Sequence, residues 1–239
     1  MRSPYGLEIQ ENCLSCTLRS DKFFCNLPGK ALQSLDAISS PTSYPKDATL
    51  FVEGQAPRGV YVLCSGRIKL SMGSSDGKVL ILRIAEPGDL LGLSAAISGT
   101  PYDLTAETME PSQVSFIKRD DFLAFLRENT DACFRAAQDL SDRYDVACRE
   151  IRSLGLSHSA AEKMARLLLE WAARAAAGGK GKGRIKIAVT HEEIAQMIGT
   201  TRETVTRILS EFRKKQIIQL KGSTLEIRNQ AALEALVNS

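Results

Sequence analysis

Short apolar segments alternate with glycine and proline between residues 44 and 116, and this spacing limits the folds open to the chain. The apolar segments cover residues 50–52, 60–63, 68–72, 79–84 and 114–117. The glycines among them are Gly54, Gly59, Gly66, Gly73, Gly77, Gly88, Gly92 and Gly99. Short strands with turn signals about every 8 to 12 residues are typical of an antiparallel sandwich or barrel. We therefore expect a β-rich domain here, preceded by a short helix over residues 27–38.

A long helical pattern follows, from about Asp120 to Leu154. Its apolar positions recur at alternating steps of four and three residues, at Cys133, Ala137, Leu140, Tyr144, Ala147, Ile151 and Leu154. Charged residues flank this narrow stripe, a pattern typical of a two-stranded coiled-coil seam. The alternative is one helix packed against its own sheet. The charged flanks favour a dimer seam, formed by Ala137, Leu140, Tyr144, Ala147, Ile151 and Leu154.

The remainder of the chain, residues 155–239, differs in charge from what precedes it. It holds 14 Lys and Arg against 8 Asp and Glu, whereas the first part holds 17 against 20. A basic module suits a polyanionic partner. Residues 155–159 indicate a hinge before this module, and residues 160–177 indicate its first helix.

Two short helices joined by Gly199 predict a helix-turn-helix in the basic module. Thr190 is suited to cap a first helix over residues 191–198, and Thr201 to cap a second over residues 202–215. A short strand over residues 185–189 and a hairpin over residues 217–227, with Lys221 in its turn, would add a β wing.

The outer N-terminal face of the second helix carries side chains that can read DNA bases. Arg202 and Arg207 can each donate two hydrogen bonds to guanine, and Glu203 can accept one from cytosine. Thr206 lies on the same face. The expected phosphate contacts come from Thr190, Thr201 and Lys221. The alternative is a charged helix face that only contacts solvent. It does not account for the helix, glycine turn, second helix and hairpin occurring together.

Three of the six cysteines lie close together near the N-terminus, at Cys13, Cys16 and Cys25. A chain of 239 residues can bury a core without disulfides, so we interpret this group as a metal or iron–sulfur site. Zinc with an outside fourth ligand, a thiol–disulfide switch and inert thiols are the alternatives. His158 and His191 are poor metal candidates, and His191 better suits a capping or phosphate-contact role.

These features together resemble the CRP/FNR family of bacterial transcription regulators. The segment VTHEEIAQMIGTTRETVTRIL is similar to the family's helix-turn-helix. The segments LFVEGQAPRGVYVLCSGRIKLS and PGDLLGLSAAISG are similar to its cyclic-nucleotide-binding β-roll. The resemblance implies an α+β fold with an N-terminal double-stranded β-roll, a long dimerisation helix and a C-terminal winged helix-turn-helix. The expected division is a cysteine-containing segment (1–26), a roll (27–119), a dimerisation helix (120–154) and a DNA-binding domain (155–239).

The resemblance also implies base-reading residues and partners. Arg202, Glu203 and Arg207 match the positions with which the cyclic AMP receptor branch reads TGTGA-type half-sites. Two subunits would then read a two-fold symmetric site on double-stranded DNA. RNA polymerase is the further partner that such a regulator implies.

For the signal, the resemblance favours an iron–sulfur cluster over cyclic AMP. Nucleotide binders of the family carry Glu after the Gly-Asp turn and an Arg-Ser pair, where this chain has Leu93 and Tyr102-Asp103. An Asp would repel the nucleotide phosphate. The redox-sensing FNR branch holds a 4Fe–4S cluster with three N-terminal cysteines and a fourth in the roll. That fourth position matches Ser115 here, which leaves Cys64 as a candidate fourth ligand, with a buried core thiol as its alternative role.

Other classes of function are not expected. We find no Ser/His/Asp or Cys/His arrangement, no phosphate loop and no HExxH motif, so the chain is not expected to be an enzyme. No apolar run approaches the roughly 18 residues of a membrane span, and the first residues lack a hydrophobic signal region. We therefore expect a cytoplasmic regulator without a membrane partner. The second hypothesis is the same architecture with a small organic effector in the roll and structural or switching cysteines.

Overall fold

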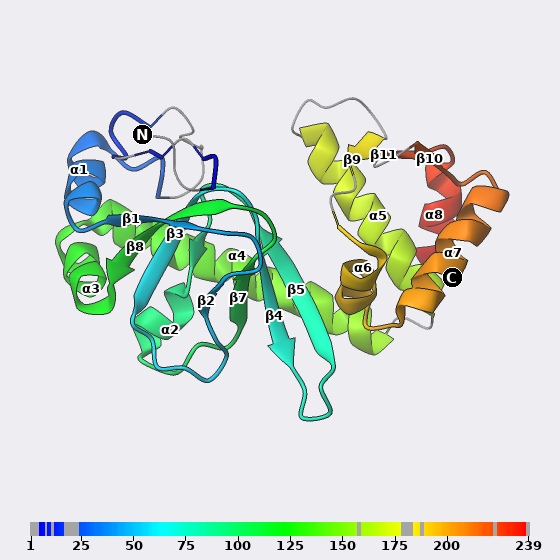
Figure 1. Cartoon of the computed structure of the whole chain (residues 1–239), viewed down its shortest axis with the longest axis horizontal. Coiled ribbons are helices and arrows are strands. Elements are labelled where there is room, and N and C mark those ends of the chain that lie inside the picture. The colour runs from blue at the N-terminus through cyan, green and yellow to red at the C-terminus, as the bar shows by residue number, and fades with distance from the viewer. Residues whose placement is uncertain are drawn as a thin grey trace. The chain divides into compact units, whose positions relative to one another are not determined.

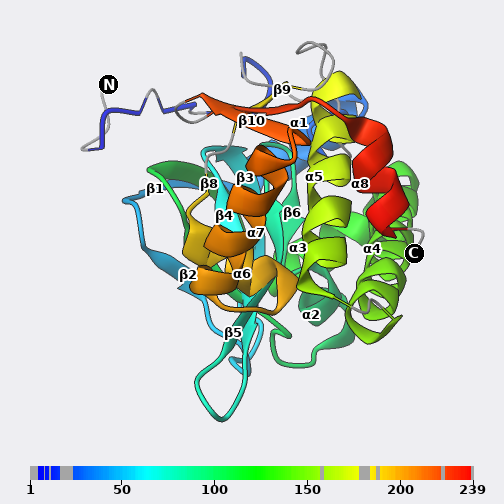
Figure 2. The same ribbon diagram turned by 90° about the vertical axis from the view of Figure 1, so that its right-hand side faces the viewer.

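The computed structural model describes residues 5–7, 9–10, 12–16, 24–156, 159–177, 184–186, 189–221 and 224–237. Its elements form two compact units, residues 1–146 and 147–239. The first unit combines two β-sheets with helices, and the second is mostly helical with one small sheet (Figures 1 and 2). The expected α+β class, with a β-rich N-terminal part and a C-terminal helix-turn-helix, is confirmed.

Within its described residues, the first unit contains eight strands and the first helices of the chain. Its strands are β1 (Ser40–Tyr44), β2 (Thr49–Phe51), β3 (Gly59–Ser65), β4 (Ile68–Gly73), β5 (Val79–Ala85), β6 (Leu90–Leu91), β7 (Thr105–Thr108) and β8 (Ser112–Lys118). Its helices are α1 (Gly29–Ala37), α2 (Leu93–Ser98), α3 (Arg119–Glu128) and the first part of α4 (Thr130–Leu156). The five predicted apolar segments all form strands, whereas β1, β6, β7 and α2 were not predicted.

The strands of this unit form two antiparallel sheets, ordered β1-β8-β3-β6 and β2-β7-β4-β5. Strand β3 is buried on both faces because its side chains alternate between two cores. Tyr61 and Leu63 enter the core shared by the two sheets. Val60 and Val62 enter a second core, formed with α1, α3 and the start of α4. The strand therefore connects the interior of the roll to the helices outside it.

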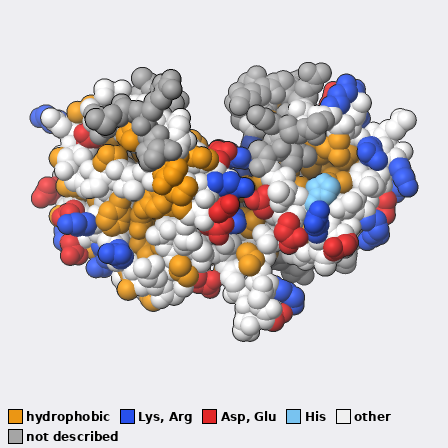
Figure 3. Space-filling model, viewed as in Figure 1, with side chains coloured by type: hydrophobic (Ala, Val, Ile, Leu, Met, Phe, Trp, Pro, Cys, Tyr) orange, Lys and Arg blue, Asp and Glu red, His pale blue; other side chains and the backbone are white. Residues whose placement is uncertain are grey.

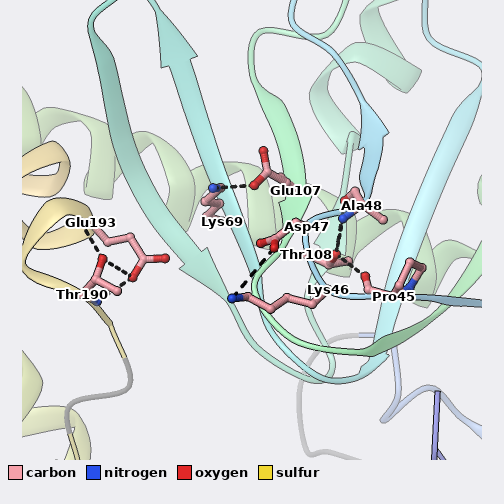
Figure 4. Close-up of polar contacts among 9 residues, drawn as sticks. All are labelled: Pro45, Lys46, Asp47, Ala48, Lys69, Glu107, Thr108, Thr190 and Glu193. Carbon is pink, nitrogen blue, oxygen red and sulfur yellow. Dashed lines mark hydrogen bonds and ion pairs between the residues drawn. The ribbon is translucent and has the colours of Figure 1, made fainter.

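A buried threonine fixes the turn between β1 and β2 (Figure 4). The Thr108 hydroxyl donates to the Pro45 carbonyl at 2.6 Å and accepts from the Ala48 amide at 2.8 Å. The side chain is fully buried, so both bonds are made away from water, where an unpaired hydroxyl would be costly.

The sequence predicted a single helix from Asp120 to Leu154. That prediction was wrong, because the segment forms two helices, α3 and α4. Helix α3 ends at Glu128, and Asn129 adopts an extended backbone with φ −124° and ψ 93°. The Asn129 side-chain amide donates to the Phe125 carbonyl at 2.9 Å. Asparagine commonly makes such local backbone bonds in competition with helix continuation. At its other end α4 extends to Leu156, two residues past the expected end and into the expected hinge.

The second unit holds the predicted helix-turn-helix. Beyond the end of α4, its elements are α5 (Ala160–Ala177), β9 (Arg184–Lys186), α6 (His191–Ile198), α7 (Arg202–Lys214), β10 (Ile218–Lys221), β11 (Thr224–Ile227) and α8 (Gln230–Val237). Strands β10, β11 and β9 form one antiparallel sheet in that order. The expected strand over 185–189 is shorter than predicted, α8 was not predicted, and the expected turn at residues 222–223 lies outside the described residues.

A single apolar core holds α6 and α7 at their crossing angle. Val205, Ile208 and Leu209 of α7 are almost fully buried against Met164 and Leu168 of α5. Gly199 ends α6 with φ +63°, the left-handed conformation that glycine adopts without steric cost. This turn leaves the opposite face of α7 open to solvent.

Candidate cysteine site and DNA-reading surface

The N-terminal segment lies against the outer face of the roll. Gln113 of β8 is fully buried. Its side chain accepts from the Gln10 amide at 2.9 Å and donates to the Gln10 carbonyl at 2.7 Å. Three residues after Gln10, the Cys13 amide donates to the Asp36 carboxylate of α1 at 2.6 Å. These bonds hold the first cysteines beside β8 and α1.

A β-bulge in β3 brings a fourth cysteine to the same place. Leu63 pairs with Val114 and Ser65 pairs with Gln113, so Cys64 between them has no partner on β8. A bulge re-aims the side chain of the extra residue and is common beside functional sites. The Cys64 thiol donates to the Val62 carbonyl of its own strand at 3.7 Å, and its side chain lines the same two pockets as Ser115 of β8. The Ser115 position and Cys64 are therefore neighbours across the two strands.

All four cysteines line one small pocket between the N-terminal segment, α1 and the roll, and three of them also line an adjoining pocket. One pocket is lined by Cys13, Cys16, Cys25 and Cys64 together with Phe24, Leu32, Leu35, Ser39, Val62, Gly88 and Ser115. The other shares Cys13, Cys16, Cys64, Ser39 and Ser115, and adds Gln10, Asn12, Asp36 and Pro41. All four thiols are half-buried, whereas Cys133 is exposed. The structure thus brings the three predicted cysteines and Cys64 to one site.

The surroundings of this site keep two of its thiols protonated. Burial, and then the carboxylate of Asp36, raises the pKa of Cys13 to about 12. Burial, and then the neighbouring cysteines beginning with Cys13, raises the pKa of Cys64 to about 12. Within the part of the chain that the structure describes, no group of three or more Cys, His, Asp or Glu side chains already stands in a metal-ligating arrangement.

Aromatic side chains fill the interior of the roll near the position where nucleotide binders carry an Arg-Ser pair. Tyr102 is buried, and its hydroxyl donates to the Gly59 carbonyl at 2.7 Å. The ring of Phe51 stacks on it at 4.1 Å between centroids. A Cβ added at Gly92 would lie 2.8 Å from the Tyr102 ring. Leu93, where those binders have Glu, is also buried.

Helix α4 presents two different faces. Ala132 and Ala136 are buried against the roll, and Leu140 packs beside them. Tyr144 and Ile151 are each 70% exposed, and the other seam residues Ala137 and Ala147 are exposed as well. Leu154 lies in α4, but its side chain is outside the described residues. Most of the predicted seam is therefore not covered by the roll.

The helix-turn-helix begins both of its helices with threonine caps, as the sequence predicted. The Thr190 hydroxyl accepts from the Glu193 amide, and the Glu193 carboxylate accepts from the Thr190 amide, which forms a capping box (Figure 4). The Thr201 hydroxyl accepts from the Thr204 amide at the start of α7. Both hydroxyls thus have a structural role in addition to the predicted phosphate contacts.

The predicted base-reading residues lie on the solvent-facing side of α7. Arg202, Glu203, Thr206 and Arg207 are all exposed, at the spacing of one helix face. Its own backbone amide, and then the Thr201 hydroxyl, hold the pKa of Glu203 below its usual value, so the side chain is an ionised acceptor. Lys221 is exposed at the end of β10. Lys and Arg side chains line the side of the second unit that carries α7 (Figure 3).

Two contacts near these sites were not predicted. Asp36 contacts Cys13 from the last turn of α1, and nothing in its sequence context distinguishes it from a solvent-exposed helix residue. His191 Nδ1 lies 3.0 Å from the Thr206 hydroxyl, across the turn between α6 and α7. The sequence placed His191 and Thr206 in the helix-turn-helix, but did not indicate that their side chains are in contact.

Comparison with known proteins identifies both units. Residues 41–129 match the model of the cyclic nucleotide-binding domain, and residues 162–236 match the Crp-like helix-turn-helix domain. A roll of this kind joined to a winged helix-turn-helix defines a DNA-binding transcription regulator. The chain belongs to the CRP/FNR family of these regulators, whose members are not enzymes.

The similar proteins extend along most of the chain. The CRP-like cAMP-activated global transcriptional regulator of Mycobacterium tuberculosis is 25% identical over 210 residues, 88% of this chain and 93% of that protein. The anaerobic regulatory protein of Bacillus subtilis is 28% identical over 190 residues, 79% of each chain. The structure of FixK2 from Bradyrhizobium japonicum has a TM-score of 0.73 and 26% identity, covering 83% of this chain and 97% of that one. In the described parts of this chain, no helix is long and apolar enough to span a membrane.

Proposed function

We propose that the chain is a homodimeric, sequence-specific regulator whose DNA binding responds to oxygen or redox state through a cysteine-ligated iron–sulfur cluster. The observation that carries the proposal is the meeting of Cys13, Cys16, Cys25 and Cys64 around one pair of pockets. Four thiolates are the ligand set of a 4Fe–4S cluster. When bound, the cluster would supply a group that oxygen can destroy, and Cys13, Cys16, Cys25 and Cys64 would hold it through their thiolates.

The electrostatics of the site argue against a thiol switch that reacts through Cys13 or Cys64. A switching cysteine reacts as the thiolate and therefore needs a lowered pKa. The pKa values of Cys13 and Cys64 are raised to about 12, so both remain protonated at neutral pH. Metal binding releases such protons and offsets the cost of the buried charge. Zinc, which also takes four thiolates, remains an alternative metal for the same ligands.

The roll interior argues against cyclic AMP as the signal of this chain, although some relatives are named for it. Tyr102 and Phe51 occupy the interior, and Leu93 takes the place of the ribose-binding Glu. A small organic effector in the roll is the second candidate. A melting shift on adding such an effector to a metal-free protein would favour it over the cluster.

Hydrogen bonds lead from Leu63, the neighbour of Cys64 in β3, to the Arg143 side chain of α4. The adjacent Leu63 donates its amide to the Asp89 carbonyl at 2.9 Å and accepts from the Gly88 amide at 2.7 Å. Leu90, which follows Asp89 in the chain, accepts through its backbone carbonyl from the Arg143 guanidinium of α4 at 2.5 Å. Movement of the bulge on cluster loss would therefore reach α4, whose exposed stripe we assign to the dimer seam. A shift at the seam would change how two copies of α7 meet successive major grooves.

Electrophoretic mobility shifts with and without air test the proposal. Wild-type protein purified without oxygen is expected to bind its operator and to lose affinity in air. Cys16→Ala and Cys64→Ala should remove this difference, whereas Cys133→Ser, a matched change at an exposed cysteine, should keep it. Oxygen-sensitive binding that persists in Cys16→Ala and Cys64→Ala would contradict the proposal.

A further inference from the structure

The hydroxyl of Thr206 is already engaged within the protein. It donates to the backbone carbonyl of Arg202, four residues earlier in α7, at 3.0 Å. It also lies 3.0 Å from Nδ1 of His191, at the start of α6. A threonine hydroxyl has one hydrogen to donate. With that hydrogen on Arg202, the second bond is one in which His191 Nδ1–H donates to Thr206.

These two bonds fix the χ1 angle of a side chain on the exposed face of α7. A threonine in a helix divides between two rotamers, and the bond to the carbonyl four residues earlier selects one. The bond from His191 holds the same rotamer from a second helix. Because the hydroxyl is engaged, the γ-methyl group is the part of the Thr206 side chain that can contact a base pair. A threonine methyl makes an apolar contact with the C5-methyl of thymine in the major groove.

We propose that Thr206 selects thymine through its methyl group, and that His191 is the positioning residue that holds the methyl in place. The inference rests on the proposed reading role of α7 and adds a base preference to it. Arg202, Glu203 and Arg207 would read their base pairs by hydrogen bonds, whereas Thr206 would read its base pair by apolar contact. His191 acts from outside α7 and need not touch a base.

The test replaces thymine by uracil, which removes only the C5-methyl. An operator is selected from random duplex DNA with the full-length chain, and each thymine is then replaced in turn. We expect roughly fourfold weaker binding for uracil at one position of each half-site, the loss for one buried methyl. Failure to select any specific operator would contradict the reading role of α7 itself. A specific operator that tolerates uracil at every position would contradict only the methyl contact.

Variants distinguish the reading role of Thr206 from the positioning role of His191. Thr206→Ser keeps both hydrogen bonds but lacks the methyl, so uracil and thymine should bind it equally. Thr206→Val keeps the methyl and should keep the preference. His191→Ala should reduce the preference, and His191→Asn should restore it because Asn Nδ2 takes the place of His Nδ1. His191→Gln, whose donor lies one bond further out, should not. Undiminished uracil discrimination in Thr206→Ser or His191→Ala would overturn the inference.

Discussion

Arg143 links α4 to strand β6, which pairs with the cysteine-bearing strand β3. Its Nη2 donates to the Leu90 carbonyl at 2.5 Å, and its Nε donates to Asp139 at 2.6 Å. The guanidinium is mostly buried, so both bonds are made in a partly dehydrated place. Arg143 is thus a direct polar link between the roll and α4.

Arg143→Ala should weaken both stability and signalling. Loss of charge-assisted hydrogen bonds predicts a decrease of about 1–3 kcal/mol in the free energy of unfolding, measured by urea denaturation. The difference in operator affinity with and without air should also shrink. Arg127→Ala, at an exposed position in the last turn of α3, is the control. A full oxygen response in Arg143→Ala would show that the signal does not pass through this contact.

A charge in the exposed stripe of α4 should dissociate the dimer. Tyr144→Glu places two like charges at an apolar seam, which costs far more than a change at a solvent-facing site. Sedimentation velocity should show dimers for the wild type and monomers for the variant. Gln138→Glu, an exposed change on another side of α4, should stay dimeric. A dimeric Tyr144→Glu protein would place the subunit interface elsewhere.

Arg207→Ala should abolish specific DNA binding. One bidentate contact is lost in each half-site, and two half-sites together predict a loss of roughly 100-fold or more in operator affinity. Arg213→Ala, at an exposed position in the last turn of the same helix, should cost much less. The comparison is made by fluorescence anisotropy at fixed salt, because phosphate contacts are salt-dependent. Unchanged operator affinity in Arg207→Ala would remove this residue from the reading set.

Alkylation of the metal-free protein should separate the cysteines by pH. Because the pKa values of Cys13 and Cys64 are raised to about 12, their thiolates form only as the pH approaches that value. Iodoacetamide should therefore label both slowly at pH 8 and faster with each rise in pH. Exposed Cys133 is the internal reference in the same peptide map. Rapid labelling of Cys13 and Cys64 at pH 8 would favour a thiol switch.

Local sequence signals predicted the helix-turn-helix better than any other part of the chain. The capping threonines and Gly199 each act within a few residues, so the bounds of α6 follow from the sequence alone. The break at Asn129 was missed because the apolar pattern continues across it. The family resemblance gave Cys64 as a candidate fourth ligand, but its position in a bulge could not be predicted, because a bulge depends on the register between β3 and β8, which are about 50 residues apart in sequence.

The candidate site residues also divide into those that local sequence patterns predicted and those that they did not. The N-terminal cysteine spacing identified three members of the cysteine group, and the exposed face of α7 followed from its helical period. The contacts of Asp36 with Cys13 and of His191 with Thr206 join different elements. Such contacts depend on how helices pack, and no local pattern in this chain encodes them.

Iron and acid-labile sulfide in protein purified without oxygen test the central claim most directly. The account predicts about four irons and four sulfides per chain, a visible colour that is lost in air, and loss of both in Cys64→Ala but not in Cys133→Ser. A colourless wild-type protein without sulfide would contradict the cluster, and leave the DNA-reading surface as the part of the account that stands.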